Sequence, residues 1–296
     1  MQNSPFHPEN RAAYEKWRDE KLARHPARVE DLIVSVTDPR CITPAEKGAI
    51  LERLSRANMA IYQSQLGTCA DKRIPVSMMR SFGATEYDHN PESDDEGVTS
   101  LTPRSEEEWE GKAFEYIPYS SKAIQWHTDG YYNPVERLVR SLILHCAQQA
   151  DEGGENELLD HEVMYILLRE ENPEHVRALM RPDAFTIPAR VENGVTVRPE
   201  QSGPVFTVDQ VDGRLYMRYT HRVKSIVWKN DVMTSGAVEA IRKILAGPNP
   251  YMFRARLAPG WGLLCNNVLH TRSAFATGQE APKRLLYRIR SFNRLA

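Results

Sequence analysis

The sequence predicts a mainly β fold with peripheral helices, of the β-sandwich or jelly-roll kind. Short apolar runs recur through the second half of the chain, separated by turns such as Asp212-Gly213 and Pro259-Gly260. Helical patterns interrupt this series at two places. The sequence contains neither GxGxxG nor GxxxxGK followed by Ser or Thr, the phosphate-binding motifs of nucleotide-binding α/β folds. These observations favour packed sheets with added helices over a doubly wound α/β sheet.

Two amphipathic helices are predicted near the N-terminus, at about residues 10–24 and 44–62. The second has clear start signals, because Thr43 is a favourable N-cap, Pro44 suits the first helical position and Glu46 can complete a capping box. We therefore expect the start of the chain to be largely helical.

An acidic, turn-rich segment at about residues 83–111 predicts a loop or lid and not a core element. Apolar runs predict strands at Leu32–Val36, Arg140–Ala147, Val205–Val208, Arg214–Tyr219, Tyr251–Leu257, Gly262–Cys265 and Arg284–Phe292. Apolar residues at helical spacing predict two further helices, at about 160–171 and 235–246.

No repeat or clear linker divides the sequence, so we expect a single domain over residues 1–296. Within it we distinguish a helical N-terminal extension at 1–65, the acidic loop or lid at about 83–111, and a β core from about 115 to 296.

Composition and charge favour a small-molecule partner. The formal net charge of −2 provides no global field that would recruit nucleic acid or an anionic membrane. The four cysteines are too few and too scattered for a disulfide framework or a zinc knuckle, and we expect reduced thiols. The first residues do not resemble a secretion signal, and no apolar stretch approaches 18 residues. We therefore expect a cytoplasmic protein without a transmembrane segment; the sequence leaves open whether it forms a homo-oligomer.

A candidate metal site begins at His127 and Asp129, which lie two residues apart just before a glycine. Residues i and i+2 of a strand project to the same face, so this imidazole and this carboxylate can share a cation. His270 offers a third ligand where an apolar strand runs into a polar stretch. Two imidazoles and one carboxylate on one face of an octahedron leave three positions open, which suits iron(II) and oxygen chemistry better than four-coordinate zinc.

The last predicted strand carries several arginines. Alternation places Arg284, Leu286, Arg288 and Arg290 on one face, and Leu285, Tyr287 and Ile289 on the other. Burying such a face is expensive unless anions neutralise it. A dicarboxylate beside the metal would do so, because guanidinium binds carboxylate with two parallel hydrogen bonds. A solvated strand face is the alternative.

An ordered set of short motifs resembles the taurine dioxygenase and clavaminate synthase-like family of Fe(II)/2-oxoglutarate-dependent oxygenases. The matching pieces are W-H-T-D-G at Trp126–Gly130, GGEN at Gly153–Asn156, N-N-x-x-H at Asn266–His270 and R-x-x-x-R at Arg284–Arg288. The resemblance covers roughly residues 115–296. It implies a double-stranded β-helix, also called a jelly-roll or cupin-like core.

The resemblance also implies cofactors and roles. His127, Asp129 and His270 would bind Fe(II), and these three would be the catalytic residues. Arg284 would hold the distal carboxylate of 2-oxoglutarate, and Arg288 would face the cosubstrate's other end or an anionic substrate. Asn156 stands where many members have a threonine that donates to the cosubstrate, and its amide can also donate.

The implied reaction is hydroxylation of an unactivated C–H bond by O2, with release of succinate and CO2. Arg288, Arg290 and Lys122 indicate a small anionic substrate, such as an amino acid, a sulfonate or an acidic sugar. Tyr131 follows the metal motif and is a further substrate candidate. Taurine itself is disfavoured, because Ala123 and Gln125 stand where taurine-like members carry an asparagine that contacts the substrate.

Residues around the motifs have expected supporting roles. Trp126, Asn266 and Asn267 are candidates to surround the metal ligands. His145, Cys146 and His161 lie in predicted regular elements and are more typical of structural residues than of ligands.

Two other classes of protein remain open from the sequence. One is a non-catalytic jelly-roll binding module for an anionic ligand, in which the His-x-Asp motif is structural. The other is a metal-dependent hydrolase that uses the same three ligands. It lacks a convincing general base such as the glutamate of HExxH.

Overall fold

The computed structural model describes residues 4–105, 117–192, 194–278 and 281–296, and short strands dominate it. The chain divides into two compact units. Unit 1 comprises Met1–Ala27, Trp126–Leu138 and Leu159–Met252, whereas unit 2 comprises Arg28–Gln125, Val139–Leu158 and Phe253–Ala296.

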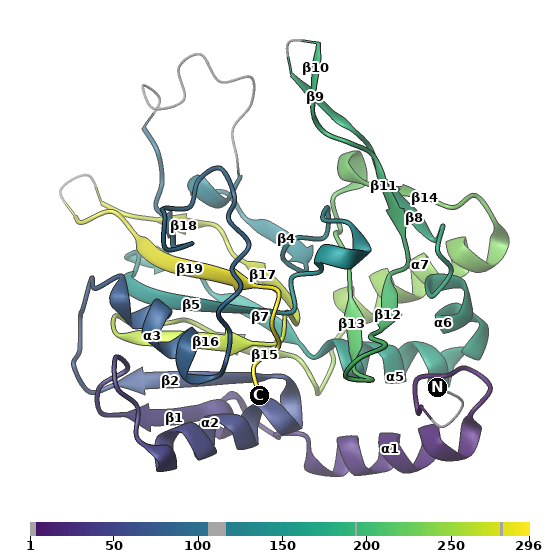
Figure 1. Ribbon diagram of the computed structural model, residues 1–296, viewed down its shortest axis with the longest axis horizontal. Coiled ribbons are helices and arrows are strands. Elements are labelled where there is room, and N and C mark those ends of the chain that lie inside the picture. Colours follow the sequence, from purple (N-terminus) through teal and green to yellow (C-terminus); the bar gives the residue numbers. More distant parts are fainter. Residues whose placement is uncertain (1–3, 106–116, 193, 279–280) are drawn as a thin grey trace. The chain divides into compact units, whose positions relative to one another are not determined.

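Unit 2 contains a six-stranded sheet (Figure 1). Its strand order is β1 (Ile33–Val36), β2 (Met59–Ser64), β16 (Trp261–Cys265), β5 (Ser141–Gln148), β19 (Leu285–Ser291) and β3 (Thr99–Leu101). The β1–β2 pair is parallel and the other pairs are antiparallel. The helices of this unit are α2 (Pro44–Ala57) and α3 (Arg73–Ser81), with 3-10 turns η1 (Val29–Leu32) and η2 (Ile117–Tyr119).

A second sheet has four strands. Its order is β15 (Phe253–Ala255), β7 (Asn156–Leu159), β17 (Leu269–Arg272) and β4 (Ile124–His127). β6 (Glu152–Gly153), which precedes β7 in the sequence, forms a short antiparallel pair with β18 (Phe275–Ala276), which follows β17. The division into units falls within β4, after Gln125, and within β7, after Leu158.

The core of unit 2 lies between its sheets and beneath its helices. One hydrophobic cluster joins Leu144 and Leu286 of the six-stranded sheet to Leu158 and Phe253 of the four-stranded sheet. A second cluster packs the other face of the six-stranded sheet, including Tyr287, against α2 and α3. Adjacent residues of β19 therefore face opposite clusters, as the alternation predicted. The expected class, mainly β with few helices, is confirmed.

Unit 1 combines helices with small sheets. Its helices are α1 (Arg11–Arg24), α5 (His161–Glu171), α6 (Pro173–Leu179) and α7 (Val232–Ala246), with 3-10 turns η3 (Val135–Arg137) and η4 (Val223–Ser225). Its strands are β8 (Phe185–Ile187), β9 (Arg190–Glu192), β10 (Val195–Arg198), β11 (Gln201–Gly203), β12 (Phe206–Val208), β13 (Leu215–Met217) and β14 (Val227–Trp228). They pair as β11-β8-β14, β12-β13 and the β9–β10 hairpin.

A buried charge cluster joins α1 to the start of α5. The ammonium of Lys21 contacts Asp160 at 2.6 Å and Glu162 at 2.5 Å, and Lys21 is only 7% exposed. Burying a lysine is tolerable here because two carboxylates neutralise it.

The predicted helix at 44–62 is wrong over its last five residues. The helix starts as expected, with the Thr43–Glu46 capping box formed, but it ends at Ala57. Asn58 takes a left-handed conformation with φ of 55°, a common way to end a helix. The following residues form the almost fully buried strand β2, in which apolar residues face both sides and leave no period to read.

The acidic segment differs from its prediction in one short strand. Val98 and Thr99 are each 1% exposed, and Thr99–Leu101 forms the edge strand β3 paired with β19. The backbone N–H of Asp88 donates to the carbonyl of Arg290, which ties the preceding residues to the same strand. Most of residues 84–98 lie outside helices and strands, as expected of a loop, and Thr99–Leu101 adds an edge strand that was not predicted. A lid role stays a prediction, and residues 106–111 lie outside the described residues.

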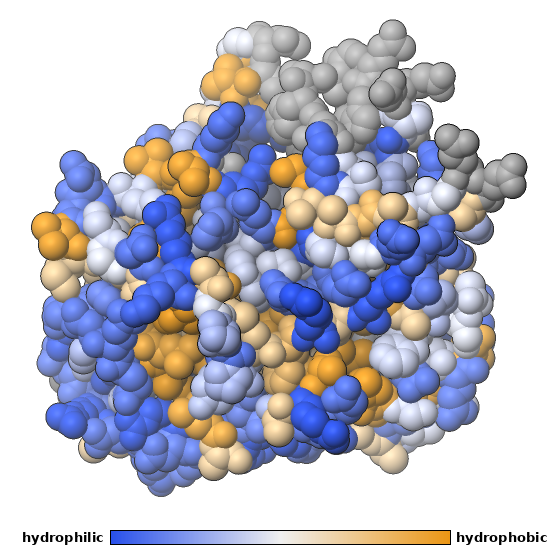
Figure 2. Space-filling view, turned by 180° about the vertical axis from the view of Figure 1, so that it is seen from behind, coloured by the Kyte–Doolittle hydropathy of each residue, from blue (hydrophilic) through white to orange (hydrophobic). Residues whose placement is uncertain are grey.

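Other elements confirm the predicted positions. The early helix is α1, and the expected strands correspond to β1, β5, β12, β13, β15, β16 and β19, with ends shifted by a few residues. The two later helices are α5 and α7, whereas α3 and α6 were not predicted. No helix within the described ranges is long and apolar enough to cross a membrane. Figure 2 shows one face of the molecule, with hydrophobic residues in separate patches among hydrophilic ones.

Candidate metal and cosubstrate residues

The His-x-Asp segment is held through its middle residue. Thr128 is fully buried, and its hydroxyl accepts the backbone N–H of Tyr219 at 3.0 Å while its own N–H donates to the Tyr219 carbonyl at 3.0 Å. Because successive side chains of an extended segment alternate, His127 and Asp129 share the opposite side. His127 Nε2 lies 3.6 Å from Asp129 Oδ1. The pair thus has the same-face arrangement that the spacing predicted.

Arg218 fixes the turn that follows. Its Nε and Nη2 donate to the Tyr131 carbonyl at 3.3 and 3.2 Å, and its guanidinium lies 4.8 Å from the Phe185 ring centroid. Arg218 is 2% exposed, and burial lowers its pKa to about 10. A Cβ at Gly203 would lie 2.4 Å from Arg218 Nη1, so glycine is needed for this close approach.

His270 lies in β17 of unit 2 and is 7% exposed. Its Nδ1 is 2.9 Å from the carbonyl of Val268. A carbonyl can only accept, so Nδ1 carries the proton and Nε2 keeps the lone pair. This is the tautomer that a metal-binding imidazole needs.

Arg284, directly before β19, is a buried cation. It is 5% exposed, and no carboxylate of the described residues forms an ion pair or hydrogen bond with it. Its guanidinium lies 4.9 Å from the Phe275 ring centroid, and burial lowers its pKa to about 10. A buried guanidinium without a protein anion is a strong candidate for a ligand's carboxylate.

The glycines of the GGEN motif shape the space around Arg284. Gly153 and Gly154 have φ of 70° and 78°. A Cβ on Gly153 would lie 2.1 Å from the Ala274 carbonyl oxygen, and one on Gly154 would lie 3.2 Å from Arg284 Nε. Both positions therefore require glycine for conformation and for close approach.

The other residues predicted to bind cosubstrate or substrate differ in burial. Asn156 is 5% exposed, and its Nδ2 donates to the Thr271 carbonyl at 2.7 Å, so one amide hydrogen serves the sheet. Arg288 is partly buried and lies in β19 opposite Thr99 and Leu144.

Lys122 is exposed, and Tyr131 is partly buried with its ring edge-on to Tyr132 at 5.3 Å.

Arg290 differs from the expectation that it contributes to an anion site. It is 4% exposed on the side chain, and its Nη2 lies 2.7 Å from Asp88 Oδ2. Asp88 comes from the acidic segment, so the protein itself supplies the anion. Arg290 is therefore a structural ion-pair residue.

Sequence reasoning missed Arg272, although it stands two residues after His270 in a strand and so shares its face. Its guanidinium donates to four carbonyls, of Ile117, Pro118, Ser120 and Lys122. Burial lowers its pKa to about 9. These bonds hold the chain just before β4, which ends at His127.

The residues expected around the metal ligands also make structural bonds. Trp126 is 8% exposed in β4. Asn267 donates to the Val139 carbonyl at 2.6 Å, and Asn266 accepts the backbone N–H of Leu295 at 3.1 Å. His145 and His161 are fully buried and bonded to backbone carbonyls, and Cys146 is 1% exposed, which fits their expected structural roles.

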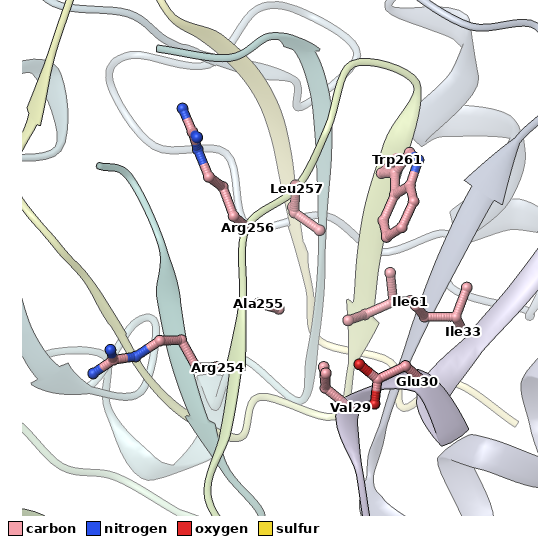
Figure 3. A pocket seen from close by; sticks show the side chains of 9 residues that line it. All are labelled: Val29, Glu30, Ile33, Ile61, Arg254, Ala255, Arg256, Leu257 and Trp261. Carbon is pink, nitrogen blue, oxygen red and sulfur yellow. The ribbon is translucent and has the colours of Figure 1, made fainter. Parts of the chain in front are cut away.

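A pocket of about 210 Å³ also lies in unit 2, but none of the predicted site residues lines it. Ile33, Ile61 and Trp261 gather on one side, while the guanidinium groups of Arg254 and Arg256 point away from them (Figure 3). Arg254 pairs with Glu157 at 2.7 Å, and Arg256 donates to the carbonyls of Ala150 and Asp151. Both cations are thus already satisfied.

Comparison with known families decides the relationship. The family model described as "Taurine catabolism dioxygenase TauD, TfdA family" matches residues 65–290. The chain belongs to the TauD/TfdA family. The family suggested by the sequence motifs is therefore confirmed, and the match begins well before residue 115.

Two curated relatives of this TauD/TfdA chain carry the name uridine-5'-phosphate dioxygenase. One, from Amycolatopsis sp, is 29% identical over 167 residues, which covers 54% of this chain and 58% of the relative. The other, from Streptomyces sp, is 30% identical over 176 residues, 57% of this chain and 60% of the relative. The chain thus matches less than two thirds of each relative's length.

Solved structures of similar fold include two oxygenases. An asparagine oxygenase in complex with Fe(II), 2S,3S-3-hydroxyasparagine and succinate has a TM-score of 0.55 and 18% identity, covering 79% of this chain and 74% of that one. The non-heme iron oxygenase OrfP in complex with Fe, succinate and (3S)-hydroxy-L-Arg has a TM-score of 0.60 and 17% identity, covering 84% and 81%. At this identity the likeness concerns the fold.

Proposed function

We propose that this TauD/TfdA-family protein is an Fe(II)/2-oxoglutarate-dependent oxygenase that hydroxylates an unactivated C–H bond of a small anionic molecule. Family membership supports the reaction type. The observation that carries the cosubstrate assignment is Arg284, a 5% exposed guanidinium with no carboxylate of the described residues to neutralise it.

The proposed iron ligands are His127, Asp129 and His270. Each of the three is a residue type that can give one ligand atom to a metal ion. The neighbouring His127 and Asp129 side chains and the Nε2 lone pair of His270 supply two nitrogen donors and one oxygen donor. This donor set suits iron(II) with open coordination positions, and it is not the thiolate-rich set typical of structural zinc.

The cosubstrate's distal carboxylate would bind Arg284. Its guanidinium sits among Phe275, the glycines of GGEN and the Cys146 thiol, so water competes poorly for it. A carboxylate there would receive parallel hydrogen bonds in a low-dielectric setting. Arg288 lies on the same strand and is proposed to face the substrate or the cosubstrate's other end.

When bound, iron and 2-oxoglutarate supply the oxidising chemistry, with succinate and CO2 as coproducts. The protein's own residues hold the proposed metal ligands in position and orient them. Thr128 sets the direction of the two ligand side chains, Val268 fixes the His270 tautomer, and Arg218 holds the turn after Asp129. Burial of Asp129 and His270, 5% and 7% exposed, limits access of water.

The core of the fold is proposed to be a double-stranded β-helix. The packing of the six-stranded sheet on strands of the four-stranded sheet in unit 2 supports it, since a jelly roll is built from two facing sheets.

The test is anaerobic mixing of the protein with Fe(II) and 2-oxoglutarate, followed by oxygen and substrate. We expect a visible charge-transfer band before oxygen and succinate after it. Asp129→Ala should abolish the band, whereas His89→Ala, at an exposed histidine, should leave it unchanged. A wild type that gives neither the band nor succinate would reject the oxygenase proposal in favour of a binding module or hydrolase. Equal loss in both variants would show that the ligands are misassigned.

A further inference from the structure

Thr220 lies directly opposite His127, the first of the proposed metal ligands. The two residues form an antiparallel bridge within unit 1. Two backbone N–H to carbonyl bonds flank this bridge, one on each side, from Thr128 to Tyr219 at 3.0 Å and from His221 to Trp126 at 2.9 Å. In such a non-hydrogen-bonded pair the Cα atoms are about 4.5 Å apart, and the two side chains project to the same face. Thr220 is therefore the cross-strand neighbour of the His127 imidazole.

The Thr220 side chain is buried and held in one orientation. It is 2% exposed, and its Oγ1 accepts the backbone N–H of Arg222 at 3.3 Å. A β-branched side chain has few χ1 orientations to choose from, and this bond selects among them. The hydroxyl is thus used within its own segment of chain, and the γ-methyl group remains to pack against neighbouring side chains.

A metal-binding imidazole needs a fixed ring orientation, which neighbouring groups provide by locking its rotamer. The other two proposed ligands have such support. A backbone carbonyl lies 2.9 Å from His270 Nδ1, and Arg218 holds the turn that follows Asp129. The contact between His127 Nε2 and Asp129 Oδ1, at 3.6 Å, joins the two donor atoms themselves. Thr220 offers a fixed surface beside the His127 ring.

A purely local role for Thr220 is the alternative. A threonine hydroxyl that bonds its own backbone two residues on is a common turn former, and the chain enters the 3-10 turn η4 here. That role needs the hydroxyl and not the methyl group. Packing against an imidazole needs the methyl group and not the hydroxyl. Substitution by serine or by valine therefore separates the two roles.

We propose that Thr220 is a positioning residue for His127, whose γ-methyl group packs against the imidazole and holds the ring in the orientation that metal binding requires. This inference rests on the proposed function, because it takes His127 as a metal ligand. Thr220 acts only through His127. Its removal therefore lowers metal affinity without removing a donor atom.

The experiment titrates the protein with Co(II) in the absence of oxygen and 2-oxoglutarate and follows visible absorbance. The d–d bands of Co(II) report both the occupancy of a site and its coordination geometry. We expect Thr220→Ala to lower the Co(II) affinity by at least about tenfold and to change the band shape, because the ring is no longer held. Thr220→Val keeps the methyl group and the branched shape and should stay within about threefold of wild type. Thr220→Ser should resemble the alanine variant.

Thr207→Ala is the matched control. Thr207 is a partly buried threonine of the same unit, in β12 opposite Tyr216. This variant should bind Co(II) as wild type does. Thermal unfolding of all variants separates a loss of stability from a change at the metal site, since only the Thr220 variants should change metal affinity.

Two results would overturn the role of Thr220. One is wild-type Co(II) affinity in Thr220→Ala. The other is wild-type affinity in Thr220→Ser together with a loss in Thr220→Val, which would make the hydroxyl the acting group.

Asp129→Ala, titrated in the same way, reports on the proposed metal site separately and should lose Co(II) binding. If Asp129→Ala binds Co(II) as wild type does, the metal assignment fails and the role of Thr220 fails with it. If Asp129→Ala loses binding while Thr220→Ala keeps it, the metal assignment stands and only the role of Thr220 is rejected.

Discussion

The two ends of strand β19 bury arginines in opposite ways. At the C-terminal end, Arg290 contacts Asp88 at 2.7 Å, and both side chains are largely buried. At the N-terminal end, Arg284 is 5% exposed with no carboxylate of the described residues beside it. A buried cation with its own protein anion is already neutralised within the fold, whereas one without a protein anion is suited to a ligand. The comparison separates a structural arginine in β19 from a proposed binding arginine directly before it.

The largest expected effect is on cosubstrate binding. Arg284→Met should lower the affinity for 2-oxoglutarate by about 100-fold, because a charge-assisted bidentate contact in a buried site contributes about 3 kcal/mol. The thermal midpoint should not fall, since an unneutralised buried charge is replaced by an apolar side chain. Titration of the charge-transfer band measures the affinity, and thermal unfolding measures the midpoint. Arg254→Gln, at a mostly exposed ion pair, is the control and should leave affinity unchanged. A large loss of stability in Arg284→Met with unchanged affinity for 2-oxoglutarate would make Arg284 a structural residue and not a binding one.

The second prediction concerns the other end of β19. Asp88→Asn should destabilise the protein by about 3–5 kcal/mol, because it leaves the Arg290 charge buried and uncompensated. The folded variant should bind 2-oxoglutarate within about twofold of wild type. Urea unfolding gives the first quantity. Adding Arg290→Met to Asp88→Asn should recover much of the stability, and no recovery would mean that the ion pair is not the cause.

A third prediction tests the close approach to Arg284. Gly154→Ala and Gly213→Ala both place a Cβ on a residue with positive φ, and both should lose about 1–2 kcal/mol of stability. The added Cβ would meet Arg284 Nε at 3.2 Å in the first case and nothing within 4 Å in the second. Only Gly154→Ala should therefore also lower the affinity for 2-oxoglutarate. Equal affinities in the two variants would show that this glycine does not shape the anion site.

The smallest expected effect is a pH dependence of stability that arises from His145 of strand β5. Its Nε2 donates to the Cys69 carbonyl and its Nδ1 accepts the Tyr62 hydroxyl, so the neutral ring is satisfied. Burial lowers its pKa below the unfolded value of about 6.5. The unfolded chain therefore takes the proton first, and stability is complete above about pH 6.5 and is lost as pH falls through the folded pKa.

His145→Gln should flatten this part of the pH–stability curve, measured by urea unfolding between about pH 5 and 8. His89→Gln, at an exposed site, should keep the wild-type slope. A wild-type slope in His145→Gln would assign the dependence to another group.

The sequence predicted the parts of the protein that local rules determine. Alternation correctly assigned the faces of β19, and the capping residues located the start of α2. It failed at β2, because a strand buried on both faces has no period that distinguishes it from a helix. The acidic composition around Asp88 likewise concealed a sheet edge, since the partner that makes β3 a strand lies far along the chain.

For the candidate site, short motifs identified the proposed metal ligands and Arg284 but not what surrounds them. Thr128 stands inside the motif, yet its role depends on Tyr219, which is distant in sequence. Arg218 has no motif at all. Its role depends on its hydrogen bonds to the Tyr131 carbonyl, which only three-dimensional contacts reveal.

The most direct measurement is an anaerobic titration of wild-type protein with 2-oxoglutarate in the presence of Fe(II), followed by visible absorbance. The proposed function predicts a charge-transfer band that saturates at one 2-oxoglutarate per chain and is lost in Asp129→Ala. A wild-type protein that binds Fe(II) but develops no band at saturating 2-oxoglutarate would contradict it.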